Sequence, residues 1–107
     1  MATSPQNPGV VTRSAEEQKR VDRETDQLAL YYHETCPLCL RVLRTSERLR
    51  LKIEKRNIRQ VPAYRDQLLQ GGGHCKVPCL LIQKDDGSLE WLYDSDAIMD
   101  YLEDRFA

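Results

Sequence analysis

The stretch His33-Glu34-Thr35-Cys36-Pro37-Leu38-Cys39-Leu40-Arg41 decides the expected fold, because the sequence changes there from a strand pattern to a helix pattern. Residues 28–32 (Leu-Ala-Leu-Tyr-Tyr) form an apolar and aromatic run of strand length. Pro37 suits the first turn of a helix, where its missing N–H costs nothing, and apolar residues then recur at helical spacing. The pattern predicts a strand, a CxxC pair and a helix in that order.

The rest of the sequence adds the elements of a small α/β domain. Alternation predicts a second strand, Pro62 opens a second helix that stops at the glycines 71–73, and Asp85-Asp86-Gly87 is typical of a hairpin turn. The expected elements after the first helix are a strand, a helix, two strands and a helix, over residues 51–57, 62–69, 79–82, 89–93 and 94–106. The order β-α-β-α-β-β-α predicts an α/β fold with a four-stranded mixed sheet and three helices.

Residues 1–27 are expected to be a polar, partly disordered N-terminal extension to a domain at residues 28–107. Asn7-Pro8-Gly9 favours turns, and the charged stretch from Arg13 to Asp26 contains almost no apolar residue. This stretch predicts a disordered start followed by a marginal, solvated helix.

Composition narrows the class of protein. The chain has 107 residues, 31% of them charged, and a net charge of -1, which indicates neither a nucleic acid nor an acidic membrane surface as partner. No apolar run reaches the roughly 18 residues of a membrane span, and no secretory signal begins the chain. We therefore expect a cytoplasmic protein, whose four cysteines favour catalysis or metal binding over structural disulfides.

The cysteine pair has three possible uses. In a redox pair, Cys36 is the expected nucleophile because a helix N-terminus stabilises negative charge, and Cys39 lies one turn further on as the resolving thiol. Alternatively, Cys36 and Cys39 join Cys75 and Cys79 in a four-thiolate zinc site, or close a structural disulfide. Otherwise Cys79 is expected to be buried in its strand and Cys75 exposed in a loop.

Three motifs from residue 28 to 106 resemble a glutaredoxin, and are also similar to the glutathione-binding N-terminal domain of glutathione S-transferases. These motifs are Tyr31 to Cys39, Val77-Pro78 and Asp94-Ser95-Asp96. The resemblance implies a thioredoxin-like fold with a cis peptide bond before Pro78. It also implies a thiol–disulfide oxidoreductase with glutathione as cofactor and disulfide-containing or glutathionylated proteins as partners. A non-catalytic glutathione-binding module is the alternative within the same resemblance.

The resemblance also implies a binding site for glutathione. Val77 would pair its backbone with the cysteinyl unit, Ser95 and Asp96 would receive the γ-glutamyl end, and Lys76 would meet the glycyl carboxylate, with Arg65 as a weaker candidate. The catalytic residues would be Cys36 and Cys39, with no metal ligand. The expected glutathione-binding residues are His33, Pro37, Leu38, Lys76, Val77, Pro78, Ser95 and Asp96.

Two features separate the sequence from its relatives. His33 and Leu38 stand where glutaredoxins commonly have a lysine and an aromatic residue. Conjugation of glutathione is not expected, because no C-terminal helical domain follows Ala107 in the sequence and the expected nucleophile belongs to a cysteine pair.

Overall fold

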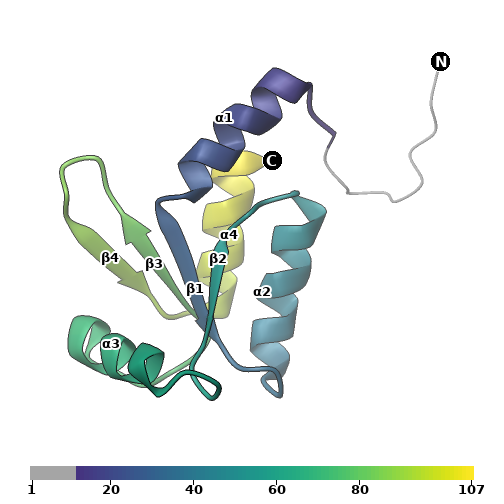
Figure 1. Ribbon diagram of the computed structural model, residues 1–107. Helices are drawn as coiled ribbons and strands as arrows, with labels where there is room; N and C mark the ends of the chain where they lie inside the picture. The colour runs from purple at the N-terminus through teal and green to yellow at the C-terminus, as the bar shows by residue number, and fades with distance from the viewer. Residues whose placement is uncertain (1–11) are drawn as a thin grey trace.

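Strand β1 (Leu28–Tyr32) lies in the interior of a four-stranded sheet in the computed structural model, which describes residues 12–107 (Figure 1). It pairs in parallel with β2 (Glu54–Asn57) and antiparallel with β3 (Cys79–Gln83). Strand β4 (Leu89–Leu92) pairs antiparallel with β3, which gives the order β2-β1-β3-β4. The α/β fold and the mixed sheet predicted from the sequence are confirmed.

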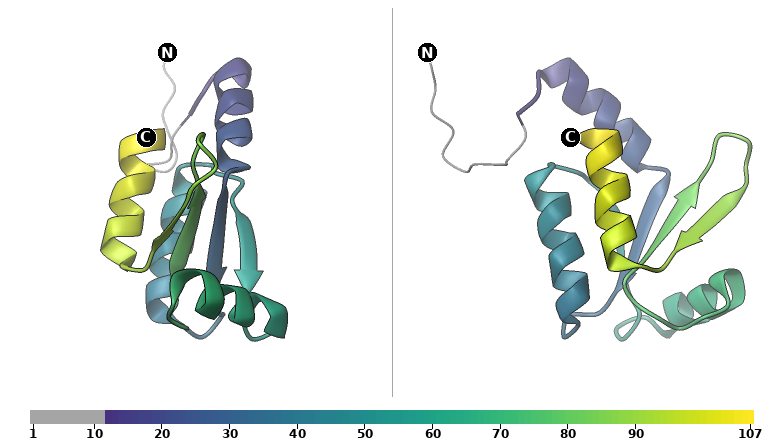
Figure 2. Two further views of the ribbon diagram at one scale, coloured as in Figure 1. Left: turned by 90° about the vertical axis from the view of Figure 1, so that its left-hand side faces the viewer. Right: turned by 180° about the vertical axis from the view of Figure 1, so that it is seen from behind.

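Helices cover both faces of this sheet. Helices α2 (Pro37–Arg48) and α4 (Ser95–Phe106) lie side by side on one face, and α3 (Pro62–Gly72) crosses part of the other (Figures 1 and 2). Leu28 and Leu30 belong to the core under α2 and α4, whereas Tyr31 belongs to a smaller cluster under α3. Because alternate residues point to opposite faces, β1 is buried from both sides.

Two boundaries differ by three residues from the sequence prediction, and the others by one residue at most. Strand β2 begins at Glu54, the first residue that pairs with β1. Leu51 and Ile53 come before the strand and are buried in the core. Helix α3 continues to Gly72 and ends at Gly73, whose φ of 89° is the left-handed conformation that a glycine adopts without steric cost. Among the helices within residues 12–107, none is both long and apolar enough to span a membrane.

The sequence predicted three helices, and helix α1 (Ala15–Thr25) is a fourth. It begins with a capping box, in which the Glu17 N–H donates to Ser14 Oγ at 3.2 Å and the Ser14 N–H donates to Glu17 Oε1 at 3.3 Å. Val21 and Thr25 are buried, so the helix expected to be solvated is packed on the domain. The predicted disorder of the first eleven residues lies outside the described residues.

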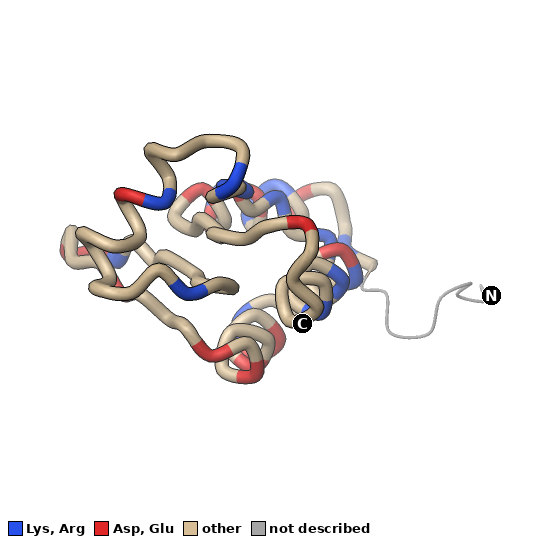
Figure 3. Tube along the Cα trace, turned by 90° about the horizontal axis from the view of Figure 1, so that it is seen from below, with Lys and Arg blue, Asp and Glu red and all other residues tan. Residues whose placement is uncertain are grey.

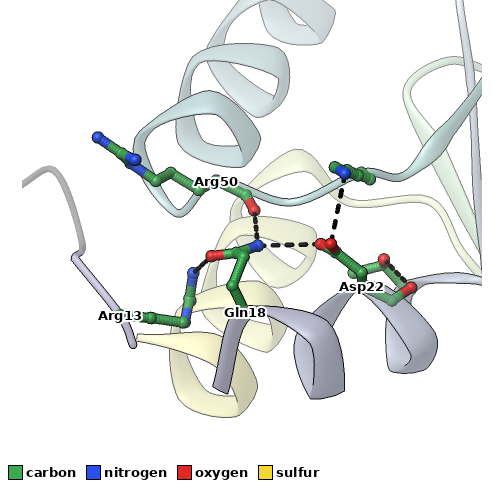
Figure 4. A network of polar contacts seen from close by, with 6 residues as sticks. Arg13, Gln18, Asp22 and Arg50 are labelled. Carbon is green, nitrogen blue, oxygen red and sulfur yellow. Dashed lines mark hydrogen bonds and ion pairs between the residues drawn. The ribbon is translucent and has the colours of Figure 1, made fainter. Parts of the chain in front are cut away.

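Polar contacts hold α1 against the ends of two other helices, and Figure 4 shows those of Gln18 with Arg13, Asp22 and Arg50. Arg13 Nη1 donates to the Leu49 carbonyl at 2.7 Å, and Arg13 Nη2 donates to the Phe106 carbonyl. Gln18 Nε2 donates to the Arg50 carbonyl at 2.9 Å. These carbonyls lie at the C-terminal ends of α2 and α4, where helices leave acceptors unpaired. The charged stretch therefore caps helices that lie far away in the sequence.

Replacing Arg13 tests this capping. We expect Arg13→Ala to lower the free energy of unfolding by about 1–3 kcal/mol, because two carbonyl groups lose a charged donor. Urea denaturation measures the change. Lys19→Ala, on an exposed position of the same helix, is the control and should have little effect. An equal loss in both variants would contradict a specific role for Arg13.

Close packing of α3 on β4 depends on Gly71. A Cβ atom added at this position would lie 2.1 Å from Trp91 Cζ2, far inside van der Waals contact. The absent side chain lets the Trp91 ring pack against the helix and approach Tyr31, whose ring centroid lies 5.6 Å away.

Gly71→Ala should therefore destabilise the protein by about 1–3 kcal/mol, since Trp91 has to leave its position. Trp91 fluorescence during denaturation reports both the stability and the changed environment of the ring. Gln70→Ala, on an exposed position of α3, is the matched comparison. Wild-type stability and fluorescence in Gly71→Ala would show that the contact is not needed.

Candidate active site

Cys36 lies where β1 passes into α2, and its own sulfur begins the helix. After β1 ends, the loop turns with the Cys36 N–H donating to the His33 carbonyl at 3.3 Å. Cys36 is the N-cap residue of α2, with extended backbone angles, and the Cys39 N–H donates to its Sγ at 3.3 Å. Pro37 occupies the first turn as predicted. The thiol therefore faces an unpaired helix N-terminus, which stabilises a negative charge on sulfur.

The two cysteines of the pair differ in environment. Cys36 is half-buried, whereas Cys39 has an exposed fraction of 0%. Burial, followed by the hydrogen bond with Cys36, raises the pKa of the Cys39 thiol to about 12. Near neutral pH, Cys39 is accordingly a protonated thiol beneath the more accessible Cys36.

Val77 and Pro78 lie directly beside the pair. The peptide bond between them is cis, as the resemblance implied, and Pro78 is fully buried. The Cys36 thiol donates to the Val77 carbonyl over 3.9 Å. The structure thus brings two other predicted site residues, Cys39 and Val77, into contact with the Cys36 sulfur.

The N-terminus of α4 supplies another part of the predicted site. Asp94 is its N-cap and accepts from the Asp96 N–H at 3.1 Å. Ser95 is buried and Asp96 is exposed. Arg41 of α2 forms an ion pair with Asp96 at 3.7 Å, a weak contact because both side chains are exposed.

A cavity of about 450 Å³ contains His33, from the loop that leads to Cys36. Its other walls come from the segment between β2 and α3, from α3 and from the loop after α3. The lining residues are His33, Ile58, Arg59, Pro62, Arg65 and Cys75. Two guanidinium groups and an imidazole make the cavity suited to anionic groups.

Asn57 and Glu34 are part of this region, and the sequence patterns pointed to neither. Asn57 is buried at the end of β2, and its Nδ2 donates to Glu34 Oε2 at 2.8 Å. This hydrogen bond holds the pKa of the Glu34 carboxyl below its usual range. The signal available in the sequence was an asparagine directly after a strand, a position that favours turns formed by the asparagine side chain.

The remaining predicted residues differ in exposure. Leu38 has an exposed fraction of 46%, and Pro37 and Lys76 are exposed, so their predicted contacts with glutathione stay predictions. Cys79 is buried, which raises the pKa of its thiol to about 12, and Cys75 is exposed.

The zinc alternative finds no ligand cluster in the part of the chain that the structure describes. All four cysteines lie within residues 12–107, and no three His, Cys, Asp or Glu side chains in that range are close enough together to hold a metal ion.

Viewed from the end where α2 begins, basic and acidic residues both occur along the trace (Figure 3).

The mixed sheet, the cysteine at the N-terminus of α2 and the cis-proline beside it together define a thioredoxin-like domain. Residues 30–107 match the family described as glutathione S-transferase, N-terminal domain, and the chain belongs to that family. No curated protein matches the chain. A thioredoxin-like protein of known structure, at 20% identity and a TM-score of 0.56, covers 70% of this chain and 97% of its own, and supports the fold alone.

Two enzymes of known structure are similar over three quarters of the chain. A maleylacetoacetate isomerase from Anaeromyxobacter dehalogenans 2CP-1, with GSH bound in its active site, is 26% identical with a TM-score of 0.58 and covers 75% of this chain. Glutathione Transferase E6 from Drosophila melanogaster is 32% identical with a TM-score of 0.56 and also covers 75%. The matched region spans only 38% and 35% of those two chains.

The cysteine environments predict selective alkylation. At pH 8, iodoacetamide should modify Cys36 and Cys75 at least about tenfold faster than Cys39 and Cys79, because thiols with a pKa of about 12 stay protonated until the pH approaches that value. Peptide mass spectrometry of the native protein measures each rate. Equal modification of all four cysteines in the native state would contradict the burial pattern.

Proposed function

We propose that this chain is a glutathione-dependent thiol–disulfide oxidoreductase of the glutaredoxin type, which reduces glutathione mixed disulfides or protein disulfides. The observation that carries the proposal is the contrast between Cys36, whose Sγ accepts from the Cys39 N–H at the start of α2, and the buried Cys39 one turn further on. One accessible thiol at a helix N-terminus and one buried thiol fit a nucleophile and a resolving group.

The reaction begins when the Cys36 thiolate attacks a glutathione mixed disulfide. A bond forms between Cys36 Sγ and the glutathione sulfur, the original disulfide bond breaks, and the substrate leaves as a thiolate that takes up a proton. A second glutathione thiolate then attacks the protein-bound glutathione. Oxidised glutathione leaves and Cys36 is regenerated as a thiolate, so the net reaction consumes one glutathione from solution and joins it to the glutathione taken from the substrate.

Cys39 acts when the substrate is a protein disulfide. Attack by Cys36 creates a mixed disulfide with the substrate, and Cys39 then attacks Cys36 Sγ and releases the reduced substrate. This step requires Cys39 to lose its proton, which the neighbouring leaving thiolate can accept. The resulting Cys36–Cys39 disulfide is reduced by glutathione.

Glutathione in this proposal binds along Val77, with its γ-glutamyl end at Ser95 and Asp96. Its glycyl carboxylate meets Lys76, with Arg65 as a weaker candidate, while His33, Pro37 and Leu38 border the sulfur. The GSH bound in the active site of the similar maleylacetoacetate isomerase supports glutathione as the ligand. The cysteine pair requires a reducing compartment, and we propose the cytoplasm.

Single-cysteine variants test the function. In a glutathione-coupled reduction of a small mixed disulfide, we expect Cys36→Ser to abolish activity, because no other accessible thiol faces a helix N-terminus in the described residues. Cys39→Ser should retain most activity on this substrate and lose it on a protein disulfide, where a resolving thiol is needed.

Glutathione binding distinguishes the alternative. Wild-type protein that binds glutathione in calorimetry but reduces no disulfide would contradict the oxidoreductase and favour the non-catalytic binding module. Activity that survives in Cys36→Ser would contradict the assignment of the nucleophile.

A further inference from the structure

Asn57 connects two loops that form the region around Cys36. Its side chain is 5% exposed, and its Oδ1 accepts from the N–H groups of Arg59 at 2.9 Å and Gln60 at 3.1 Å. Its Nδ2 donates to Glu34 Oε2 at 2.8 Å. One buried amide therefore forms the turn after β2 and also reaches the loop between β1 and α2.

We propose that Asn57, through Glu34, is a positioning residue that holds Cys36 at the N-terminus of α2 for reaction. The inference rests on the proposed function for its catalytic consequence. Glu34 lies two residues before Cys36, in a loop of four residues from His33 to Cys36. In such a short loop, movement of Glu34 changes the direction in which the chain enters the helix, and with it the place of Sγ.

The backbone supports the same connection. Tyr32, the last residue of β1, is the register partner of Asn57, and the Ile58 N–H donates to the Tyr32 carbonyl at 2.9 Å. The two loops thus leave the sheet side by side, and the bond between Asn57 and Glu34 continues the pairing beyond the strands. His33 and Arg59, one from each loop, line the same cavity. Loss of the hydrogen bond between Asn57 and Glu34, which we call the tie, would loosen the two loops that form these walls of the cavity.

The two side chains of this hydrogen bond differ in burial. Asn57 is buried and Glu34 is exposed, so the amide has few other partners available while the carboxylate could otherwise turn to water. A buried amide donor left without an acceptor is costly. The pair therefore favours the loop conformation in which Glu34 returns to Asn57, and in which the Cys39 N–H meets Cys36 Sγ.

Two variants of Glu34 separate the hydrogen bond from the charge. Glu34→Gln and Glu34→Ala both remove one negative charge, but only the glutamine keeps an oxygen that accepts from Asn57 Nδ2. If the charge alone mattered, the two variants would behave alike. We expect Glu34→Ala to react about three- to tenfold more slowly than Glu34→Gln, because Cys36 is less well placed.

A reciprocal exchange tests the tie from the other side. Asn57→Asp keeps the acceptor for Arg59 and Gln60 but places a carboxylate against Glu34, so the tie breaks. Adding Glu34→Gln restores it in the reverse direction, because the introduced glutamine amide now donates to the introduced aspartate carboxylate. The double variant has the net charge of the wild type. We expect the single variant to be slow and the double variant to recover.

Two rate constants are measured for each variant. One is for reduction of a glutathione mixed disulfide. The other is for alkylation of Cys36 by iodoacetamide at pH 7, with mass spectrometry distinguishing Cys36 from the other cysteines. Melting temperatures confirm that the variants are folded at the assay temperature. Lys55→Ala, at an exposed position of β2, is the control and should keep the wild-type rates.

Recovery in the double variant, together with a difference between Glu34→Ala and Glu34→Gln, supports the tie. Equal rates in the two Glu34 variants, or no recovery in the double variant, would overturn it. Alkylation does not involve glutathione. A wild type that fails to reduce disulfides therefore contradicts the proposed function, while the alkylation rates still decide whether Asn57 positions Cys36.

Discussion

Burial of strand β1 from both faces is the constraint on which the other elements depend. Its alternate side chains supply both the core under α2 and α4 and the smaller cluster under α3. Because β1 is fixed in the interior of the sheet, the place where the chain leaves its C-terminal end is fixed as well, and the loop to Cys36 begins there. The position of Cys36 therefore depends on the most completely buried strand.

The same contact that begins α2 also prepares the site. Cys36 Sγ accepts from the Cys39 N–H in the place where a serine or aspartate oxygen usually caps a helix. Burial of Cys39 on the inner side of that first turn keeps its thiol protonated. Helix initiation and the different environments of the two cysteine side chains thus follow from one piece of local geometry.

Polar side chains add to the apolar packing that connects the parts of this small domain. Arg13 and Gln18 of the α1 region bond to carbonyls at the ends of α2 and α4, and Asn57 bonds to the loop before Cys36. Arg13 and Gln18 supply donors to carbonyls at helix ends, and Asn57 Oδ1 accepts from the N–H groups of Arg59 and Gln60 just after β2, where the regular ladder stops. The family match begins at residue 30, so α1 lies outside the matched residues and is joined to them by such contacts and by burial of Val21 in the core.

Local sequence patterns were enough to predict the sheet, the helix at Pro37 and the hairpin, because periodicity and turn residues act over a few neighbouring positions. The cis bond at Pro78 was indicated only through resemblance. The packing of α1 and the tie between Asn57 and Glu34 emerged only in three dimensions. The partners of Arg13 are backbone carbonyls 36 and 93 positions away, and Glu34 and Asn57 are 23 positions apart. Hydrogen bonds between such distant groups leave no periodic trace in the sequence, since they exist only once the sheet has brought the loops together.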